Sequence, residues 1–216
     1  MVEYKKQPER GEKMQGSTIC GIKWYKYDIR EMTDAEFHNW YAMMSAEKQK
    51  RVDRFHFTDD KKRTVAGEML ARKAISQRCG VSAECISFMT GENDKPYAEN
   101  LSVEFNISHS GDFVVCAVSD RPVGIDIERV RPIDLKIAKK ICTPDEMQYL
   151  FGHIPSEDEL GITEDREILE RFFSLWTQKE AYGKCTGEGL FHKSKKSGIT
   201  EAFIPDDDYI IAICYE

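Results

Sequence analysis

The sequence contains no apolar run long enough to cross a bilayer. Its first 17 residues are polar and charged, and they lack the apolar core and the small-residue cleavage site of a secretory signal. Hydrophobic residues make up 41% of the 216 residues and charged residues 32%, a balance that is too apolar for a disordered chain. We therefore expect a soluble globular protein of the cytoplasm that has no membrane partner.

Paired cysteines and clustered histidines are also missing. The seven cysteines show no C-x-x-C spacing, and the five histidines are dispersed along the chain. A zinc site would have to gather its ligands from distant segments, whereas the reduced thiols of a cytosolic protein need no such arrangement. The sequence therefore gives no support to a zinc site.

The chain has no overall excess of positive charge. Its net charge of −7 argues against non-specific binding of nucleic acid, so we expect no nucleic-acid partner. The charge is uneven, however, because residues 48–73 carry nine basic side chains against four acidic ones. This stretch suggests a defined anionic ligand or partner, and it equally fits a solvated, charge-rich helix. The nine basic residues are Lys48, Lys50, Arg51, Arg54, Lys61, Lys62, Arg63, Arg72 and Lys73.

The spacing of the apolar residues predicts an α+β chain whose folded part begins near residue 19. The predicted strands cover 19–29, 86–89, 103–107, 113–119, 123–127 and 209–215. The predicted helices cover 33–44, 61–77, 133–142, 144–151 and 167–184, and Gly80, Gly187 and Gly189 end the two longest. The neighbouring strands over 113–119 and 123–127 are predicted to form a hairpin through residues 120–122.

Two stretches of the sequence resemble each other. Residues 112–118 (Asp-Phe-Val-Val-Cys-Ala-Val) and 208–214 (Asp-Tyr-Ile-Ile-Ala-Ile-Cys) each follow a long predicted helix. The likeness suggests a duplicated α+β unit with a ligand cleft between its halves, although any two apolar strands look alike.

The pentapeptide over 124–128 (Gly-Ile-Asp-Ile-Glu) carries the clearest chemical signal. On a strand, Asp126 and Glu128 share one face while the two isoleucines share the other. Two carboxylates about 7 Å apart repel by about 2 kcal/mol at an effective dielectric constant near 20, so a cation is expected beside them. Oxygen-only ligands favour Mg²⁺. The alternative is an exposed edge strand with solvated acids.

The last long helix carries further charged groups on one face. Trp176, Glu180 and Lys184 are spaced four apart, and Lys179 lies beside them. A surface pair of Glu180 and Lys184 explains this spacing, but a third metal ligand with lysines for phosphate oxygens explains it as well. Similarly, residues 108–111 (Ser-His-Ser-Gly) could form a plain turn or donate hydrogen bonds to a phosphate.

Three motifs together resemble the signature of the Sfp-type 4′-phosphopantetheinyl transferases. They are the stretches over 105–111 (Phe-Asn-Ile-Ser-His-Ser-Gly), 124–128 and 176–184 (Trp-Thr-Gln-Lys-Glu-Ala-Tyr-Gly-Lys). The basic stretch over 48–75 and the turn over 91–96 fit the same family. The resemblance covers about residues 19–190, and it is specific because the three motifs occur in the family's order and spacing.

This resemblance implies an α+β, pseudo-duplicated fold of two halves, each a small sheet packed with a long helix. Residues 19–120 and 121–216 would be the halves, with the second one shortened, and residues 1–18 a flexible extension. Coenzyme A and Mg²⁺ would lie between the halves of a monomer. An apo acyl- or peptidyl-carrier protein of fatty-acid, polyketide or nonribosomal peptide biosynthesis would be the partner.

The motif positions also imply roles for individual residues. By position, the metal ligands are Asp126, Glu128 and Glu180. The residues that match the family's contacts to coenzyme A are Lys48, Arg51 and Arg63 for the 3′-phosphate, Lys95 and Pro96 beside the adenine, and Ser108, His109, Lys179 and Lys184 on the phosphates.

The implied activity is that of a holo-[acyl-carrier-protein] synthase. A carrier serine attacks the β-phosphate of coenzyme A and 3′,5′-ADP leaves, with Glu180, Lys184 and Asp126 as the catalytic residues. Two alternatives remain at this point. One is a catalytically silent relative that binds coenzyme A or another nucleotide, and the other is a Mg²⁺-dependent phosphohydrolase.

Overall fold

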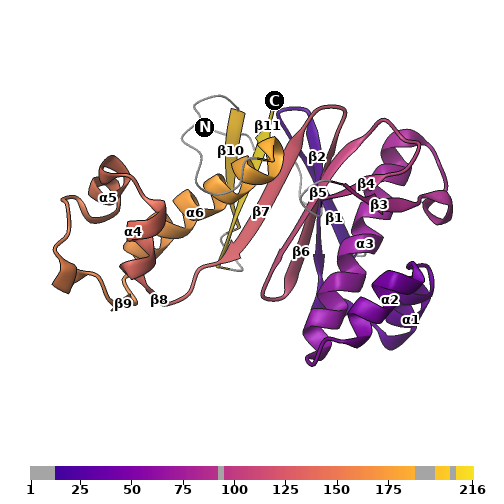
Figure 1. Cartoon of the computed structure of the whole chain (residues 1–216), viewed down its shortest axis with the longest axis horizontal. Helices are drawn as coiled ribbons and strands as arrows, with labels where there is room; N and C mark the ends of the chain where they lie inside the picture. The colour runs from indigo at the N-terminus through magenta and orange to yellow at the C-terminus, as the bar shows by residue number, and fades with distance from the viewer. Residues whose placement is uncertain (1–12, 92–94, 188–197, 205–207) are drawn as a thin grey trace. The chain divides into compact units, whose positions relative to one another are not determined.

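The computed structural model describes residues 13–91, 95–187, 198–204 and 208–216, and of 198–204 it describes the backbone alone. The chain divides into two compact units, Met1–Asp120 and Arg121–Glu216, and both are drawn in Figure 1. In the part of the chain that the structure describes, no helix combines the length and the apolar character needed to span a membrane.

The first unit is built on a four-stranded antiparallel sheet in the order β1-β2-β6-β5. Its strands are β1 (Met14–Ile19), β2 (Ile22–Asp28), β5 (Glu104–Ser110) and β6 (Phe113–Ser119). The long helix α3 (Thr58–Cys79) packs on β2, β5 and β6, and every residue of β6 is buried. The smaller elements are α1 (Asp34–Ala42), α2 (Ala46–Asp53), β3 (Phe88–Thr90) and β4 (Pro96–Ala98).

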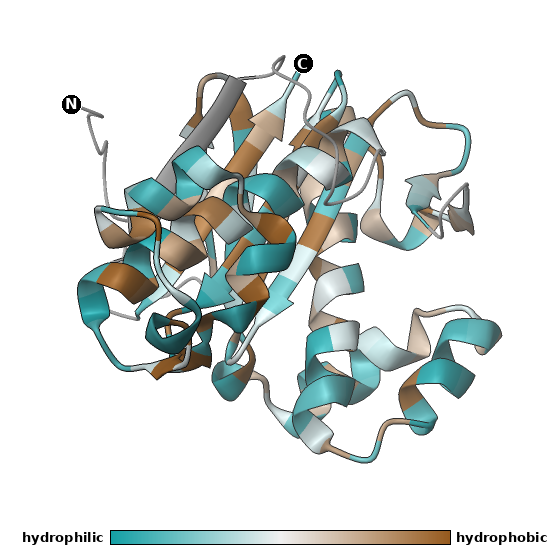
Figure 2. Ribbon diagram, turned by 60° about the vertical axis from the view of Figure 1, so that its left-hand side comes forward, coloured by the Kyte–Doolittle hydropathy of each residue, from teal (hydrophilic) through white to brown (hydrophobic). Residues whose placement is uncertain are grey.

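The second unit contains a three-stranded antiparallel sheet in the order β10-β11-β7. Its strands are β7 (Val123–Arg129), β10 (Gly198–Ile204) and β11 (Tyr209–Tyr215). Helix α6 (Arg166–Thr186) packs against all three strands. The smaller elements are α4 (Ala138–Ile141), α5 (Pro144–Phe151) and the short pair β8 (Ile133–Asp134) and β9 (Ile162–Thr163). Figure 2 shows hydrophobic and hydrophilic residues alternating along the helices, as expected for helices with one packed face.

Local sequence signals explain where the helices begin and end. Thr33 and Thr143 cap α1 and α5 with reciprocal capping boxes, and Pro144 occupies the first turn of α5. The long helices α3 and α6 end at Gly80 and Gly187, whose φ angles of 69° and 76° place them in the left-handed region. The predicted helices over 61–77 and 167–184 are therefore confirmed, each a few residues longer than expected.

The two units repeat one topology. In the first, β2-β6-β5 packs with α3, and in the second, β7-β11-β10 packs with α6 in the same strand order. The hydrogen bond that follows β2 recurs after β7. Ile29 N donates to Asp112 O at 2.9 Å, and Val130 N donates to Asp208 O at 2.8 Å. The duplication predicted from the two similar stretches is thus confirmed.

Two predictions about strands were wrong. Residues 14–18 were assigned to a flexible extension, but they belong to β1, which pairs with β2. Cys20 and Gly21 form the two-residue turn between these strands, with φ angles of 48° and 83°. Strands β6 and β7 do not form a hairpin, because β6 pairs with β2 and β5 while β7 pairs with β11. Both neighbours of β6 are supplied by its own sheet, so no edge remains for β7.

Two further details differ from the prediction. Residues 133–142 form β8, a 3-10 turn over Leu135–Ile137 and the short helix α4 instead of one helix. Strand β10 was not predicted at all. Gly189, expected to end the last long helix with Gly187, lies outside the described residues.

Strand β7 approaches α6 so closely that a side chain at Gly124 would have no room. A Cβ atom there would lie 2.0 Å from Ala181 O and 2.6 Å from Cys185 N, which are backbone atoms of the helix. Glycine at this position is therefore required by the contact between strand and helix.

We expect Gly124→Ala to destabilise the protein by at least about 3 kcal/mol, because backbone atoms cannot move aside as flexible side chains do. The matched control is Gly161→Ala, where a Cβ atom meets nothing within 4 Å and which should change stability by less than about 0.5 kcal/mol. Urea-induced unfolding of both variants measures the difference. Equal stability of the two variants would contradict the close packing.

Candidate functional site

Strand β7 presents the predicted pair of carboxylates in the second unit. Ile125 and Ile127 are buried in the core, as the alternation along a strand requires. Asp126 is itself only 4% exposed, whereas Glu128 is partly exposed and lies 3.5 Å from Arg131. The alternative of solvated acids on an exposed edge strand therefore does not hold for Asp126.

Helix α6 brings a lysine directly to this carboxylate. Lys184 Nζ lies 2.6 Å from Asp126 Oδ1 and 3.4 Å from the carbonyl oxygen of Ile125. A hydrogen bond between two charged groups at this distance is a strong one, and it offsets part of the cost of burying Asp126. Lys184 is consequently tied to β7 and does not simply form a surface pair with Glu180.

Glu180 lies one helical turn before Lys184 and interacts electrostatically with Asp126 and Glu128. Burial raises the pKa of its carboxyl group above the ordinary value, and the neighbouring Lys184 ammonium lowers it. The charges of Asp126 and Glu128 then raise the pKa of Glu180 further. The three predicted metal ligands thus interact electrostatically within one unit of the fold.

The composition of this cluster suits a hard divalent cation. Its donors are carboxylate oxygens, without thiolate or imidazole, as Mg²⁺ prefers. Among the described residues, however, no three His, Cys, Asp or Glu side chains converge as a ready-made metal site. The positive charge beside Asp126 is instead the ammonium group of Lys184.

The other lysine of this helix points to a different partner. Lys179 Nζ lies 2.8 Å from Glu146 Oε1 of α5, and both side chains are about one-quarter exposed. Its predicted contact with the phosphates of coenzyme A remains a prediction.

The first unit holds the remaining predicted contacts. Ser108 and His109 belong to β5 itself, where they lie opposite Val115 and Val114 of β6. Ser108 is buried and His109 is exposed, so the two side chains occupy opposite faces of the strand. The turn follows at Gly111, with a φ angle of 53°. Of the predicted segment 108–111, residues 108–110 thus belong to the strand and Gly111 to the turn, while the contact of Ser108 and His109 with phosphate remains a prediction.

Helix α3 holds this hairpin turn through Arg63. Arg63 Nη1 donates to Gly111 O at 2.7 Å and Nη2 donates to Asp60 Oδ1 at 2.6 Å. The structure therefore brings Arg63 to the hairpin formed by β5 and β6, which carries Ser108 and His109.

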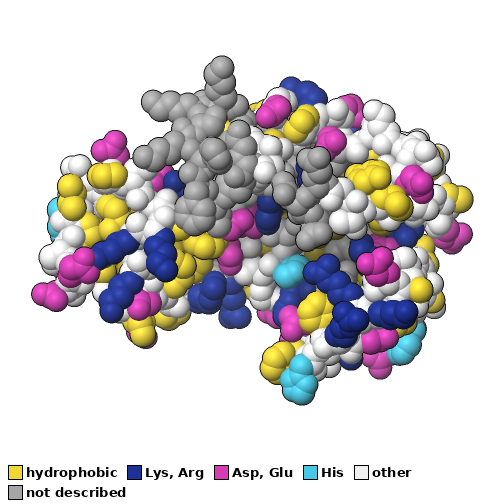
Figure 3. All heavy atoms as spheres, in the orientation of Figure 1, with side chains coloured by type: hydrophobic (Ala, Val, Ile, Leu, Met, Phe, Trp, Pro, Cys, Tyr) yellow, Lys and Arg dark blue, Asp and Glu magenta, His cyan; other side chains and the backbone are white. Residues whose placement is uncertain are grey.

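The other basic residues of the first unit lie on separate elements. Lys48 of α2 pairs with Glu68 of α3 at 2.8 Å, and Lys95 pairs with Glu104 at 3.4 Å. Arg51 is an exposed residue of α2, and Pro96 begins β4. Figure 3 shows dark-blue Lys and Arg side chains gathered over the region of α1 and α2.

The buried partner of Lys48 was not predicted from the sequence. Glu68 and Arg72 are only 4% and 8% exposed, and they form an ion pair with each other. The available signal was a Glu-to-Arg spacing of four within the apolar pattern of α3, which places an ion pair on a helix that is largely buried.

The duplication allows the Asp126–Lys184 pair to be compared with the matching positions of the first unit. Counted from the equivalent strand ends, Tyr25 of β2 matches Asp126 of β7, and counted from Gly80 and Gly187, Gln77 matches Lys184. These counterparts also touch, because Tyr25 Oη donates to Gln77 Oε1 at 2.8 Å. One geometry therefore carries an uncharged pair in the first unit and an ion pair in the second.

Two family models match this chain, and they divide it at the boundary between the two units. The family model described as "4′-phosphopantetheinyl transferase, N-terminal" matches residues 31–121. The family model described as "4′-phosphopantetheinyl transferase superfamily" matches residues 122–214. The chain belongs to the 4′-phosphopantetheinyl transferase superfamily.

Individual relatives agree with this assignment. The chain is 43% identical over 148 residues to 4′-phosphopantetheinyl transferase psf-1 of Bacillus pumilus, which covers 68% of this chain and 59% of that protein. It is 36% identical over 165 residues to 4′-phosphopantetheinyl transferase Sfp of Bacillus subtilis (strain 168), covering 76% and 69%. It is also 32% identical over 167 residues to 4′-phosphopantetheinyl transferase HetI of Nostoc sp., covering 74% and 66%.

The ion pair at Asp126 yields a test of the site's geometry. We expect Lys184→Met to lower the free energy of unfolding by about 1–3 kcal/mol, because a buried carboxylate loses a charged hydrogen-bond donor. Lys179→Met, on the same helix, removes a partly exposed pair and should cost less than about 1 kcal/mol. Urea denaturation of both variants decides, and a larger loss for Lys179→Met would contradict this geometry.

Proposed function

We propose that this chain transfers the 4′-phosphopantetheine group of coenzyme A to a serine of an apo acyl- or peptidyl-carrier protein, with Mg²⁺ as cofactor. The observation that carries the proposal is the cluster of Asp126, Glu180 and Lys184, with its 2.6 Å ion pair. Membership in the superfamily supports the same conclusion.

The proposed reaction is a phosphoryl transfer. The serine oxygen attacks the β-phosphorus of coenzyme A and forms a new P–O bond, while the bond to the bridging oxygen of the pyrophosphate breaks. 3′,5′-ADP leaves with the electron pair of that bond, and the serine hydroxyl gives up its proton. Such a reaction needs positioned charges more than covalent participation of the enzyme.

The second unit would supply the groups at the reacting centre. Asp126, Glu128 and Glu180 would hold the magnesium ion, which when bound neutralises negative charge on the pyrophosphate. Lys184, already within hydrogen-bonding distance of Asp126, would stabilise the leaving oxygens. Glu180 would accept the serine proton, because a carboxylate beside the reacting centre is a suitable general base.

The first unit would bind the nucleotide. Lys48, Arg51 and Arg63 would contact the 3′-phosphate, and Lys95 and Pro96 would lie beside the adenine. Ser108 and His109 would contact the other phosphates, together with Lys179 of the second unit. We further expect a monomer that acts in the cytoplasm, with residues 19–120 and 121–216 as its functional halves.

The transfer reaction has a direct test. The protein is incubated with coenzyme A, magnesium chloride and several apo carrier proteins, and the carriers are weighed by intact-protein mass spectrometry. We expect at least one carrier to gain the mass of phosphopantetheine, and a Ser→Ala carrier to gain none. Cleavage of coenzyme A without any carrier would favour a phosphohydrolase, and binding without turnover would favour a silent relative.

The carboxylates are tested by isosteric substitution. We expect Asp126→Asn and Glu180→Gln to slow the transfer at least about 100-fold, because each removes a charge from the reacting centre. The matched control is Glu170→Gln, which removes a carboxylate from the exposed face of the same helix, where it pairs with Arg166. That variant should retain the wild-type rate. Wild-type rates for folded Asp126→Asn would sink the assignment.

A further inference from the structure

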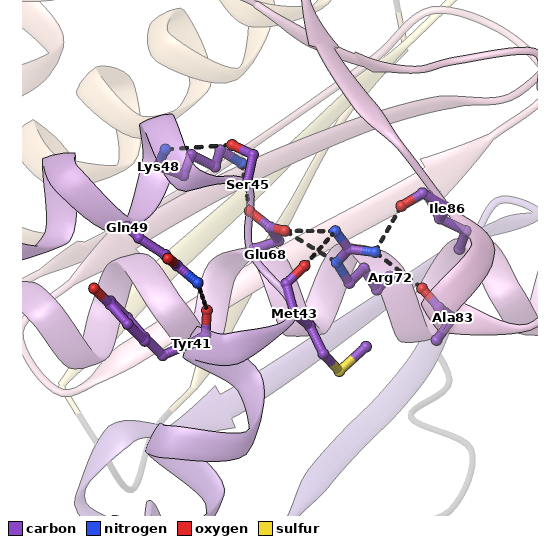
Figure 4. A network of polar contacts seen from close by, with 9 residues as sticks. All are labelled: Tyr41, Met43, Ser45, Lys48, Gln49, Glu68, Arg72, Ala83 and Ile86. Carbon is purple, nitrogen blue, oxygen red and sulfur yellow. Dashed lines mark hydrogen bonds and ion pairs between the residues drawn. The ribbon is translucent and has the colours of Figure 1, made fainter.

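A buried network of charges lies beneath Lys48 in the first unit, and Figure 4 shows its members. At its centre is Glu68 of α3, whose side chain is 3% exposed. Arg72 approaches one carboxylate oxygen, with Nε at 3.0 Å and Nη2 at 2.7 Å from Oε1. Lys48 Nζ approaches the other, at 2.8 Å from Oε2. A single buried carboxylate therefore serves two cations.

Arg72 is fixed by hydrogen bonds to three separate segments. Besides Glu68, its guanidinium donates to Ala83 O at 3.0 Å, Ile86 O at 2.6 Å and Met43 O at 3.3 Å. Guanidinium has five N–H donors, and these five hydrogen bonds use all of them. Arg72 can therefore hold Glu68 in one orientation, with Oε2 directed at Lys48.

The network leaves its surplus charge at the surface. Two cations and one anion give a net charge of +1, and Lys48 is its most exposed member, with a side chain that is 33% exposed. The ammonium also lies over the ring of Phe88, 5.2 Å from its centroid, which is within the range of a cation–π interaction. A lysine held in this way has lost much of its rotamer freedom before any ligand arrives.

We infer that Glu68 is a positioning residue, which directs the ammonium of Lys48 toward the 3′-phosphate of coenzyme A. This inference rests on the proposed function, in which Lys48 contacts that phosphate. Glu68 would act through Lys48 alone and would not touch the ligand.

The sign of the effect separates positioning from simple electrostatics. Removing the negative charge of Glu68 makes the surroundings of Lys48 more positive, which by itself would strengthen the binding of an anion. If Glu68 instead holds the ammonium in place, its removal weakens binding, because the lysine must then be ordered by the ligand.

The experiment measures the dissociation constants of coenzyme A and of 3′-dephospho-coenzyme A by calorimetry on the full chain, in magnesium chloride. For Glu68→Gln we expect coenzyme A to bind about 5–10-fold more weakly, the effect expected from losing part of one charged contact. The 3′-dephospho ligand should change less than about 2-fold. The variant Lys48→Gln should lose at least as much affinity for coenzyme A. The double variant with Glu68→Gln should bind coenzyme A no more weakly than Lys48→Gln alone.

The controls address folding and charge. Asp120→Asn removes a carboxylate that pairs with Arg78 at the C-terminal end of α3, about 15 Å along the helix from Glu68, and should leave both constants unchanged. Glu68→Asp keeps the charge on a shorter side chain and should restore part of the affinity for coenzyme A. Thermal unfolding of each variant confirms that it is folded.

Several outcomes would overturn the inference. Tighter binding of coenzyme A by Glu68→Gln would show that the charge acts without positioning, and equal weakening of both ligands would show a structural role. If the wild-type protein bound both ligands with equal affinity, Lys48 would not contact the 3′-phosphate, and the inference would fail. The carrier assay then shows separately whether the proposed function also fails.

The contact itself is checked without coenzyme A. Acetic anhydride labels accessible lysines, and we expect Lys48 to be labelled about 2-fold or more faster in Glu68→Gln, because its ammonium is no longer held in an ion pair. Lys73 of α3, which lies 5.3 Å from the ring centroid of Trp40, is the internal reference. Unchanged labelling of Lys48 would overturn the inference whatever the ligand.

Discussion

The candidate site depends on the direct contact of one strand with one helix. At Gly124 the backbone of β7 lies against the backbone of α6 near Ala181 and Cys185, with no side chain between them. On the helix, these two residues directly follow Glu180 and Lys184, and on the strand Asp126 follows two residues after the glycine. The absence of a single Cβ atom therefore sets the distance between the acids of the strand and the charged groups of the helix.

The same scaffold without these charges is present in the first unit. There the matching positions hold Tyr25 and Gln77, a neutral pair joined by one hydrogen bond. A neutral pair at the edge of the core needs little compensation, and Gln77 is in fact exposed, whereas a buried carboxylate must find a cation. Duplication thus supplied the geometry twice, and the chemistry of phosphoryl transfer is proposed for the copy that carries ionised groups.

Local signals in the sequence predicted much of this structure. Periodicity located α3 and α6, and the alternation in β7 placed Asp126 and Glu128 together. Pairing between strands was harder to predict, because β1 has few apolar residues and gains its place through backbone hydrogen bonds with β2. The buried ion pair of Glu68 and Arg72 was not predicted for a related reason, because its burial depends on carbonyl groups that are distant in the sequence.

The five hydrogen bonds of Arg72 also have a consequence for local unfolding. They join the connection between α1 and α2, the middle of α3 and the segment before β3, through Met43, Glu68 and Ile86. If any one of these segments opened, a buried charge would lose a partner that water could not replace without entering the core. These three segments should therefore exchange their amide hydrogens as one cooperative unit, although they lie apart in the sequence.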